Sequence, residues 1–295
     1  MSTLRIGDAR IDSVMEFEGP YRFPNEMYPD ADAGLVDEHR PWLEPRYLDP
    51  ASGQLIFAFR SFLIRTDRLT ILVDGCVGNH KNRPERPVWH QQNWPWMDNL
   101  RAQGVAPEEI DLVMCTHLHV DHIGWNTKLE DGRWVPTFPN AKYLFHEKEY
   151  AFWEEEYPKQ AWIKDAFADS VLPVVDAGLA EMVSGDHEID RGIWLEPSPG
   201  HTPGHVSMNL ERDGARGVFC GDLMHTPLQI PEAQLSTIFC TDPELSRATR
   251  TAFVDRHADT DTIILPAHFP GSGTGGGHIV GCMHGDKAGF RPLES

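Results

Sequence analysis

The chain has 295 residues, of which 40% are hydrophobic and 24% are charged, as is usual for a soluble globular protein. Its 26 basic and 45 acidic residues leave a formal charge of −19, which argues against a nucleic-acid partner because phosphate binding needs a basic face. No apolar run approaches the ~20 residues of a membrane span, and we expect neither a membrane segment nor a secretory signal.

The cysteines are odd in number, widely spaced and without a CxxC pair. This pattern does not indicate a disulfide framework. We therefore expect reduced, mostly buried thiols and a cytoplasmic location. The five residues are Cys76, Cys115, Cys220, Cys240 and Cys282.

The first part of the chain, residues 1–53, is rich in Pro, Asp and Tyr and only weakly periodic. We predict an N-terminal extension here, packed on the core of a catalytic domain that spans 54–295, with a single domain overall. Residues 54–66 and 69–75 are rich in β-forming residues and flank a polar turn, so they predict a hairpin.

Further elements follow in order. Residues 80–97 form a loop with three tryptophans, and a short helix then ends at Gly104. The run 111–116 predicts a buried strand, and the region 141–156 changes from strand to acidic helix.

The last third of the chain alternates in the same way. Strands are expected in 192–201, 205–214, 215–222 and 261–271, and a helix capped by Asp242 in 242–258. Strands that alternate with helices, with polar clusters at the strand ends, predict an α/β layered domain with its site on loops at one edge of the sheets.

The stretch "THLHVDHIG" at 116–124 directly follows a predicted strand. It places His117, His119, Asp121 and His122 within six positions. So many ligands are crowded for one tetrahedral ion but suit two neighbouring ions. Imidazole and carboxylate together favour zinc, with manganese, iron or cobalt as alternatives. The competing interpretation, a polar loop of unrelated histidines, would hold for a lone histidine but not for this pattern.

Two ions need further ligands, and three later segments offer them. His201 lies in "SPGHTPGH", Asp222 ends the strand "VFCGD", and His268 follows the strand before "AHFPG". All three follow apolar strands, so we expect them at strand ends like the first motif.

As a set, these motifs resemble those of the metallo-β-lactamase-fold hydrolase superfamily over roughly residues 54–280. The resemblance implies an αββα sandwich of two mixed sheets flanked by helices, with the metals at one sheet edge. It assigns His117, His119 and His201 to one metal, Asp121, His122 and His268 to the other, and Asp222 to both. The layout is most similar to the N-acyl homoserine lactonases and the methyl parathion hydrolase-like dinuclear zinc hydrolases.

The resemblance implies two Zn²⁺ ions per chain and a metal-bridging hydroxide that opens a small ester, preferably a lactone. Aryl ester or organophosphate triester hydrolysis, and a mononuclear iron enzyme similar to persulfide dioxygenases, are the alternatives. Lactonases of this family carry a tyrosine three residues after the bridging aspartate, where this chain has His225. We expect Asp121 to relay a proton and His225 to donate to the substrate. The expected partner is a small ester or lactone, and a homodimer is left open.

Two neighbouring features have two interpretations each. Asp74 either orients a ligand histidine, as at a superfamily position, or serves as a strand-end turn residue. The tryptophans of the 86–97 loop pack in the core or a dimer contact, or they line the pocket. In the second case, replacing Trp94 and Trp96 by alanine should raise KM.

Overall fold

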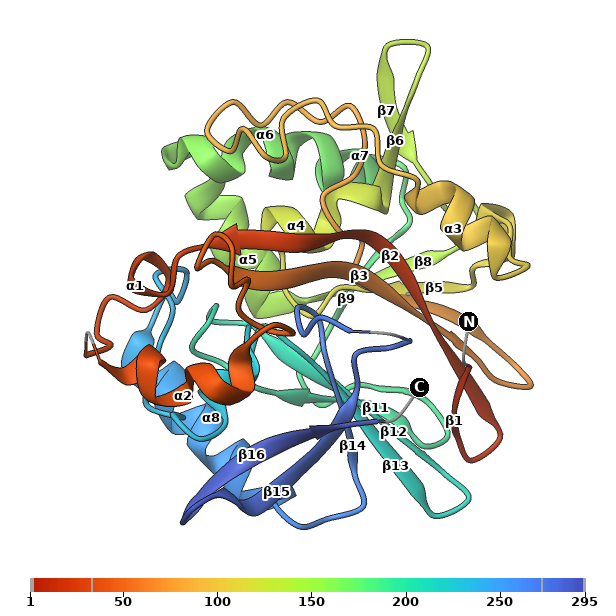
Figure 1. Ribbon diagram of the computed structural model, residues 1–295. Coiled ribbons are helices and arrows are strands. Elements are labelled where there is room, and N and C mark those ends of the chain that lie inside the picture. Colours follow the sequence, from red (N-terminus) through yellow and green to blue (C-terminus); the bar gives the residue numbers. More distant parts are fainter. Residues whose placement is uncertain (1–2, 33, 272, 294–295) are drawn as a thin grey trace.

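The longest apolar runs of the chain become the central strands of two facing β-sheets. The computed structural model describes residues 3–32, 34–271 and 273–293. In this part of the chain there are two seven-stranded sheets and one two-stranded ribbon. Helices cover the outer side of each sheet (Figure 1). The predicted αββα sandwich is confirmed.

The first sheet has the order β1-β2-β3-β4-β5-β8-β9. Neighbours are antiparallel from β1 to β4 and parallel from β4 to β9. Arg65 pairs with Thr70 across the turn of the β3–β4 hairpin, which confirms the hairpin predicted for 54–75. The strands are β1 (Leu4–Ile6), β2 (Ala9–Arg22), β3 (Leu55–Arg65), β4 (Thr70–Val73), β5 (Leu112–Met114), β8 (Lys142–His146) and β9 (Ala180–Val183).

The second sheet has the order β10-β11-β12-β13-β14-β15-β16. Its neighbours are antiparallel except for β13 and β14, which are parallel. The strands are β10 (Glu188–Asp190), β11 (Ile193–Pro197), β12 (Val206–Arg212), β13 (Ala215–Gly221), β14 (Ile263–Pro266), β15 (Gly277–His284) and β16 (Lys287–Pro292).

An apolar layer joins the two sheets. Phe62 of β3 meets Phe219 of β13 edge-on at a centroid distance of 5.2 Å. Met114, Met208 and Leu265 are buried in the same cluster. Burial of this layer removes apolar area from water and stabilises the sandwich.

Helices bury a second apolar face on each sheet. The first sheet carries α3 (Trp96–Ala102), α4 (Val120–Ile123), α5 (Glu147–Glu156), α6 (Ala161–Ser170) and α7 (Leu172–Asp176) on its outer side, and the ribbon of β6 (Thr127–Glu130) and β7 (Arg133–Pro136) projects beyond them (Figure 1). The other side of the molecule carries α1 (Pro24–Met27), α2 (Leu35–Leu43) and α8 (Pro243–His257). The predicted cap of α8 is confirmed, because Asp242 Oδ1 accepts the amide of Leu245 at 3.0 Å.

The N-terminal segment contributes directly to the first sheet. β2 pairs with β3 from Arg10–Arg65 to Arg22–Leu55, and α1 and α2 follow before β3 begins. Strands on either side of residue 53 are thus hydrogen-bonded to each other in one sheet. The boundary between extension and catalytic domain at residue 53 stays a prediction. No helix among the described residues is both long and apolar enough to span a bilayer.

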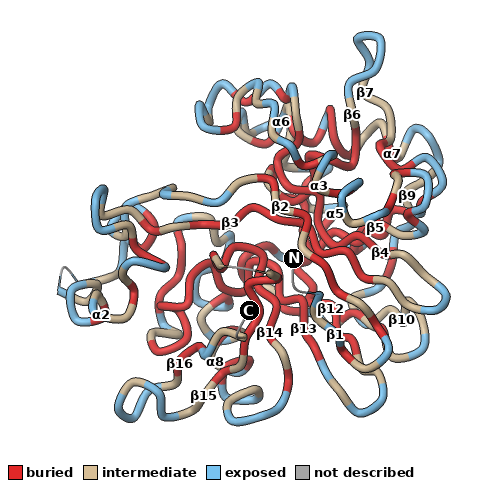
Figure 2. The backbone as a smooth tube through the Cα atoms, turned by 45° about the vertical axis from the view of Figure 1, so that its right-hand side comes forward, coloured by how far each residue is buried: buried red, intermediate tan, exposed pale blue. Residues whose placement is uncertain are grey.

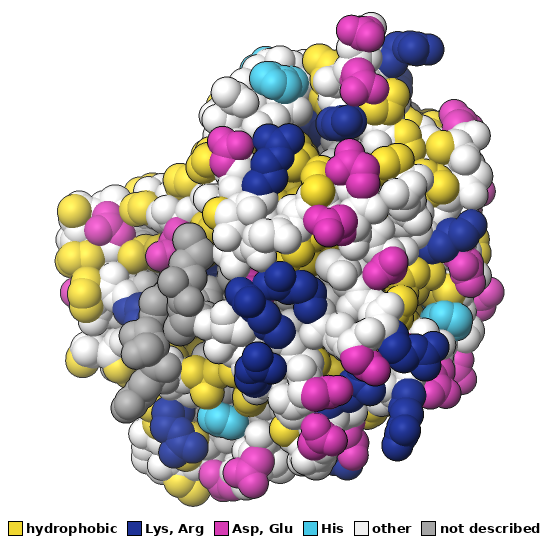
Figure 3. Space-filling view, turned by 90° about the vertical axis from the view of Figure 1, so that its right-hand side faces the viewer, with side chains coloured by type: hydrophobic (Ala, Val, Ile, Leu, Met, Phe, Trp, Pro, Cys, Tyr) yellow, Lys and Arg dark blue, Asp and Glu magenta, His cyan; other side chains and the backbone are white. Residues whose placement is uncertain are grey.

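Charge is distributed without a dominant sign on the face drawn in Figure 3, where basic and acidic side chains lie among one another. Of the five cysteines, Cys76, Cys115 and Cys220 are buried, and all five are free thiols. Figure 2 shows that the backbone is most continuously buried where the two sheets meet. The loops that carry the metal-ligand motifs leave the strands in this buried region.

Candidate metal centre

The first motif lies between β5 and α4. His117 lies at a bend after β5, His119 is the extended residue before the four-residue helix α4, and Asp121 and His122 belong to α4. The rings of His117 and His119 lie 4.7 Å apart, so both face the same space, as expected. The helical turn that follows directs His122 back toward these two residues. The ring centroids of His117 and His122 lie 4.1 Å apart.

The other three residues come from the second sheet. His201 lies in the loop between β11 and β12, Asp222 directly after β13, and His268 two residues after β14. Because β13 and β14 are parallel neighbours, their carboxyl ends meet at one edge, and Asp222 and His268 lie side by side. The structure thus brings together all seven side chains that the sequence indicated.

Their donor atoms form two groups. Within each group the nitrogen and oxygen atoms lie within 4.8 Å of one another, as one shared cation requires. One group contains His117, His119, His201 and Asp222, and the other contains Asp121, His122 and His268. This division agrees with the one implied by the family resemblance.

Asp222 faces both groups with different oxygens. Its Oδ2 lies 3.3 Å from His201 Nε2 and 3.7 Å from His117 Nε2. Its Oδ1 lies 3.0 Å from His268 Nε2 and 3.2 Å from His122 Nε2. A carboxylate with one oxygen toward each group is positioned to bridge two ions.

The chemistry of these atoms fits bound cations. Asp222 Oδ1, His122 Nε2 and His268 Nε2 are buried without a hydrogen-bond partner among the described residues. His201 Nε2 points at two other imidazole nitrogens, His117 Nε2 at 3.2 Å and His119 Nδ1 at 2.9 Å. Buried polar atoms that converge without partners are costly unless a ligand satisfies them, and imidazole with carboxylate is a donor set for zinc and similar ions.

The opposite ring nitrogens are held by protein groups. Asp74 Oδ2 binds His122 Nδ1 at 2.9 Å, and the Ala58 carbonyl accepts from His268 Nδ1 at 2.9 Å. Asp74 also accepts the amide and hydroxyl of Thr116, which contacts His117 Nδ1 at 3.1 Å. Of the two interpretations of Asp74, the geometry favours the first, because this carboxylate fixes the orientation of His122.

His205 lies behind the cluster. Its Nε2 accepts the backbone amide of Asp222 at 3.0 Å, and its Nδ1 is 2.8 Å from Ser198 Oγ. Gly221 has φ +48°, and a Cβ there would lie 2.7 Å from both His205 Nε2 and Thr116 Oγ1. A glycine before Asp222 is thus required by this close approach.

A buried carboxylate that the sequence did not indicate connects the two motifs. Glu149 of α5 accepts the amides of Leu118 and Gly204, both at 3.0 Å, and the indole of Trp153 at 2.7 Å. It therefore joins the loop of His117 to the loop of His201. Its position four residues before Trp153 in an acidic helix carried no signal in the sequence.

Burial and the neighbouring charges set the protonation of the histidines. Burial lowers the pKa of His119 to about 3 and the pKa of His117 and His201 well below the ordinary value. Burial also acts on His122, but Asp222, Asp74 and Asp121 outweigh it and raise the pKa of this ring. Neutral imidazoles are what metal binding needs, and the lowered pKa values of His117, His119 and His201 favour this state, whereas the carboxylates around His122 favour its protonated form.

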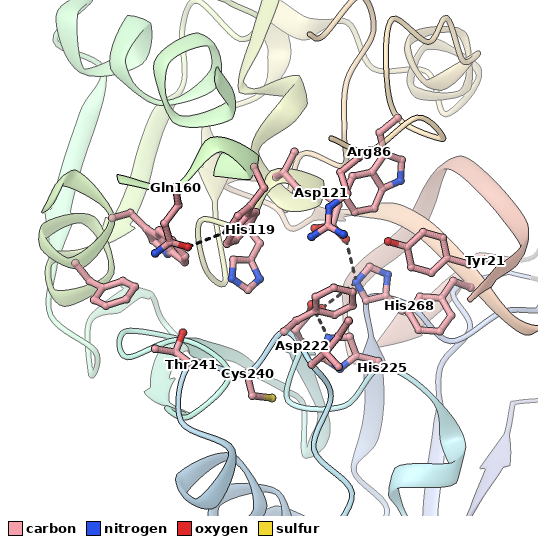
Figure 4. Close-up of a pocket in the computed structure, with 18 residues that line it drawn as sticks. Tyr21, Arg86, His119, Asp121, Gln160, Asp222, His225, Cys240, Thr241 and His268 are labelled. Atoms are coloured by element: carbon pink, nitrogen blue, oxygen red, sulfur yellow. Dashed lines mark hydrogen bonds and ion pairs between the residues drawn. The ribbon is translucent and has the colours of Figure 1, made fainter. Parts of the chain in front are cut away.

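A cavity of about 380 Å³ opens onto both groups (Figure 4). His225 lines it, with Nε2 3.1 Å from Asp222 Oδ2 and its ring stacked on His268 at 5.7 Å. Its Nδ1 has no hydrogen-bond partner within the described ranges. A role of His225 in catalysis stays a prediction, and its place in the cavity is consistent with it.

The loop of residues 86–97 lines the cavity, but with other residues than Trp94 and Trp96. Arg86 and Trp89 line it, whereas Trp94 and Trp96 do not. Trp96 is fully buried and stacks on Trp125 at 4.8 Å, and Trp94 packs against Phe17. The hypothesis that the 86–97 loop lines the pocket is thus confirmed for Arg86 and Trp89 and wrong for Trp94 and Trp96, because the helix that begins at Trp96 turns this ring into the core.

Aromatic residues from distant segments complete the cavity. Phe152, Trp153 and Trp162 line it from the helical side. Sequence reasoning missed the others, because nothing in their local pattern distinguishes them from core residues. These are Tyr21, Phe57, Ile238 and Phe239.

The fold and the site define a class of protein: an α/β sandwich of two mixed sheets with a histidine and aspartate cluster at one sheet edge. Residues 60–268, which are 209 of 295, match the model of the family described as "Metallo-beta-lactamase superfamily". The chain belongs to this superfamily. The resemblance predicted from the motifs is confirmed at that level.

Individual relatives are more distant. An N-acyl homoserine lactonase of Bacillus cereus is 30% identical over 116 residues, 39% of this chain and 38% of the relative. Metallo-beta-lactamase domain-containing protein 1 of Xenopus laevis is 26% identical over 225 residues, 76% of each chain. The alignment with the lactonase thus spans well under half of either protein.

Two solved structures cover nearly the whole fold. A hydrolase, AbOPH, of the beta lactamase superfamily has a TM-score of 0.81 at 23% identity, with 99% of this chain and 97% of that chain covered. AidC, a dizinc quorum-quenching lactonase, has a TM-score of 0.77 at 19% identity, with 100% and 97% covered. At these identities the structures show the shared fold.

Proposed function

We propose that this protein is a dinuclear metal-dependent hydrolase that opens a small ester, with a lactone as the preferred substrate class. The observation that carries the proposal is the position of Asp222, with one oxygen toward each group of donors. The partial similarity to proteins named N-acyl homoserine lactonases supports the lactone as substrate class.

Seven side chains would hold the ions, as proposed from the motifs. His117, His119 and His201 would hold one, Asp121, His122 and His268 the other, and Asp222 both. When bound, the two ions would supply Lewis acidity and lower the pKa of a water molecule, so that hydroxide is available at neutral pH. Zinc suits the donor set, and manganese, iron and cobalt are alternatives.

The residues of this chain have separate tasks in hydrolysis. Water adds its oxygen to the carbonyl carbon, the bond to the leaving oxygen breaks, and one proton passes from water to the alkoxide. Asp121 lies at the cavity wall 3.6 Å from His268 Nε2 and can carry that proton. With the neutral ring in its Nδ1–H tautomer, His225 can donate from Nδ1, which has no described partner, to the oxygen that gains negative charge.

A second substrate class has its own support. Phe57, Trp89, Trp153, Trp162 and Phe239 line the cavity, and rings of this kind pack well against an aryl group. Aryl esters and aryl phosphotriesters are therefore the second candidates. A mononuclear iron enzyme is disfavoured, because the donors form two groups and Asp222 faces both.

The test is a hydrolysis screen with a metal count. Purified protein loaded with zinc, manganese or cobalt is assayed with lactones, aryl esters and phosphotriesters, while elemental analysis counts the ions. We expect about two ions per chain and the highest kcat/KM on a lactone. About one iron per chain, with no hydrolysis of any ester, would contradict the proposal.

His225→Ala tests the proposed donor. We expect kcat/KM to fall by about 100-fold or more, in the range for loss of a general acid or an oxyanion donor, with the metal content unchanged. His187→Ala, which replaces a histidine of the turn between β9 and β10, is the matched control. A loss of one ion in His225→Ala would instead identify His225 as a ligand.

A further inference from the structure

Arg86 is a positive charge in the cavity that forms no ion pair with any carboxylate among the described residues. It lies in the segment between β4 and α3 and lines the cavity together with His119 and Asp121 (Figure 4). No ion pair or side-chain hydrogen bond joins its guanidinium to any residue in the described ranges, and its buried Nε has no partner there. Asp121 has ion-pair contacts with His122 and His268 instead.

Aromatic rings hold this guanidinium. Its Cζ lies 5.6 Å from the ring centroid of Phe239 and 5.9 Å from those of Trp89 and Trp162. Cation–π contacts use the ring faces and leave the planar N–H donors of arginine free. The side chain is therefore positioned without using its hydrogen-bonding capacity.

A second arginine adds to the positive charge. Arg22 Cζ lies 5.4 Å from the centroid of Phe239 and 5.7 Å from that of Tyr21, so two guanidiniums share one phenyl ring. Burial raises the pKa of the Tyr21 hydroxyl, and the charges of Arg22 and Arg86 both act against this rise. Figure 4 shows that this hydroxyl points into the cavity.

Contacts with α6 fix the segment that carries Arg86. Arg83 forms two hydrogen bonds to Asp169 of α6, at 2.7 and 2.9 Å, and Lys81 lies 3.4 Å from the same carboxylate. The Arg86 amide donates to the Arg83 carbonyl, and the Trp89 amide donates to the Arg86 carbonyl. Arg83 thus has the bidentate carboxylate partner that Arg86, one turn later, lacks.

An unpaired cation next to a site for two further cations is unfavourable unless an anion lies between them. The planar fork of arginine matches a carboxylate in two parallel hydrogen bonds. We propose that Arg86 binds a carboxylate of the substrate, so that the substrate is an ester or lactone with a carboxylate on an aromatic or apolar body. This inference rests on the proposed function and specifies its substrate class.

The test compares two esters that differ only in charge. Phenyl acetates with a carboxylate at the meta or para position are assayed against the matched carboxamides, with the zinc-loaded enzyme. We expect the wild type to prefer the anionic ester, and the ratio of the two kcat/KM values to fall about 10- to 100-fold in Arg86→Met. Arg86→Lys should retain part of the preference, because it keeps the charge but not the fork.

Arg101→Met is the control, since Arg101 is a largely exposed arginine of α3 whose side chain is 63% accessible. It should leave the ratio unchanged. Added salt should lower the ratio more in the wild type than in Arg86→Met, because the variant lacks the Arg86 charge, whereas Arg22 and the ions are present in both. Thermal unfolding of each variant verifies that it is folded.

The outcomes separate the two proposals. Hydrolysis of both esters with the same kcat/KM ratio in wild type and folded Arg86→Met would overturn this inference and leave the proposed function standing. Absence of hydrolysis for every ester, with the ions bound, would overturn the proposed function and this inference with it.

Discussion

Single carboxylates organise the candidate centre at the level of residues. Asp74 binds His122 from behind, Glu149 joins two loops, and Asp222 faces both groups of donors. A carboxylate behind an imidazole fixes its tautomer and makes it a stronger donor. We therefore expect the affinity for metal to depend on residues that do not touch the ions.

Asp74→Asn tests this expectation. The amide keeps the shape of the side chain but loses the charge that acts on His122, so metal affinity should fall by about 10- to 100-fold. Competition with a chromogenic chelator measures the dissociation constants. Asp111→Asn, at an exposed aspartate before β5, is the control. Unchanged affinity in Asp74→Asn would show that Asp74 only shapes the turn.

The sequence predicted residues whose chemistry is rare in combination and missed those whose chemistry is common. Four candidate ligands within six positions can be recognised from the sequence whatever the fold around them. Tyr21 and Phe239 are ordinary aromatic residues until two distant segments bring them to one cavity. For Trp96 the sequence left core and pocket open, and the structure makes it a core residue.

Irregular elements hold the strand ends of the site in place. Glu16 lies at a bulge of β2, where Met15 pairs with Arg60 and Phe17 with Phe59. The bulge directs Glu16 inward, where it accepts the amides of Val77 and Gly78 and the indole of Trp125. The sequence patterns of strand and loop gave no indication of this bulge.

Glu16→Gln should change how stability depends on pH. Burial raises the pKa of Glu16 to about 7, above its ordinary 4.5. Between these values the folded state binds more protons than the unfolded state, so the free energy of unfolding falls as pH rises. The contribution lost over this window is about 3 kcal/mol. Denaturant titrations at pH 4.5 to 7 should give a flatter profile for Glu16→Gln.

The matched control is Glu108→Gln, which replaces an exposed glutamate of the short helical turn before β5. It should keep the slope of the wild type. The same slope in Glu16→Gln as in the wild type would show that Glu16 is ionised in the folded protein throughout this range.

The contact between Asp169 and the 81–89 segment leads to a second prediction about the packing of elements. Asp169 is buried and pairs with both Arg83 and Lys81. Asp169→Asn would leave the buried guanidinium of Arg83 without its charged partner, so the free energy of unfolding should fall by about 3–5 kcal/mol. Asp176→Asn, at the exposed last residue of α7, is the control in denaturant titrations. Equal losses in the two variants would contradict the assignment.

The candidate centre spans both halves of the whole molecule. The segment between β5 and α4 belongs to the first sheet, whereas His201, Asp222 and His268 follow strands of the second. Bound ions would therefore cross-link the two sheets at one edge. Ions there would also satisfy the buried nitrogens that face one another and Asp222 Oδ1, which has no hydrogen-bond partner among the described residues.

Metal removal should consequently lower thermal stability. At a free ion concentration a thousand times Kd, one bound ion adds about 4 kcal/mol to the free energy of unfolding. For a chain of this size, such a loss lowers Tm by about 6 °C. Calorimetry before and after chelation, and after zinc is restored, measures the change. An unchanged Tm after verified metal loss would contradict a cross-linking role.

Much of this molecule could be predicted from local patterns. The β3–β4 hairpin, the Asp242 cap of α8 and all seven candidate ligands follow from apolar runs, turn residues and rare ligand spacing. These signals act over a few residues, so they need no knowledge of the fold. The cytoplasmic location and the homodimer stay predictions.

The tertiary structure decided what surrounds the candidate ligands. Register between β2 and β3 directs Tyr21 and Glu16, and the parallel pair β13–β14 sets Asp222 beside His268. Asp169 binds Arg83 and thereby fixes the segment of Arg86, whose guanidinium lies among rings from three segments. Strand pairing and packing between distant segments determine such neighbours, and no local spacing encodes them. The sequence by itself thus determined the metal-binding chemistry, and only the fold decided which charge and which aromatic walls a substrate meets.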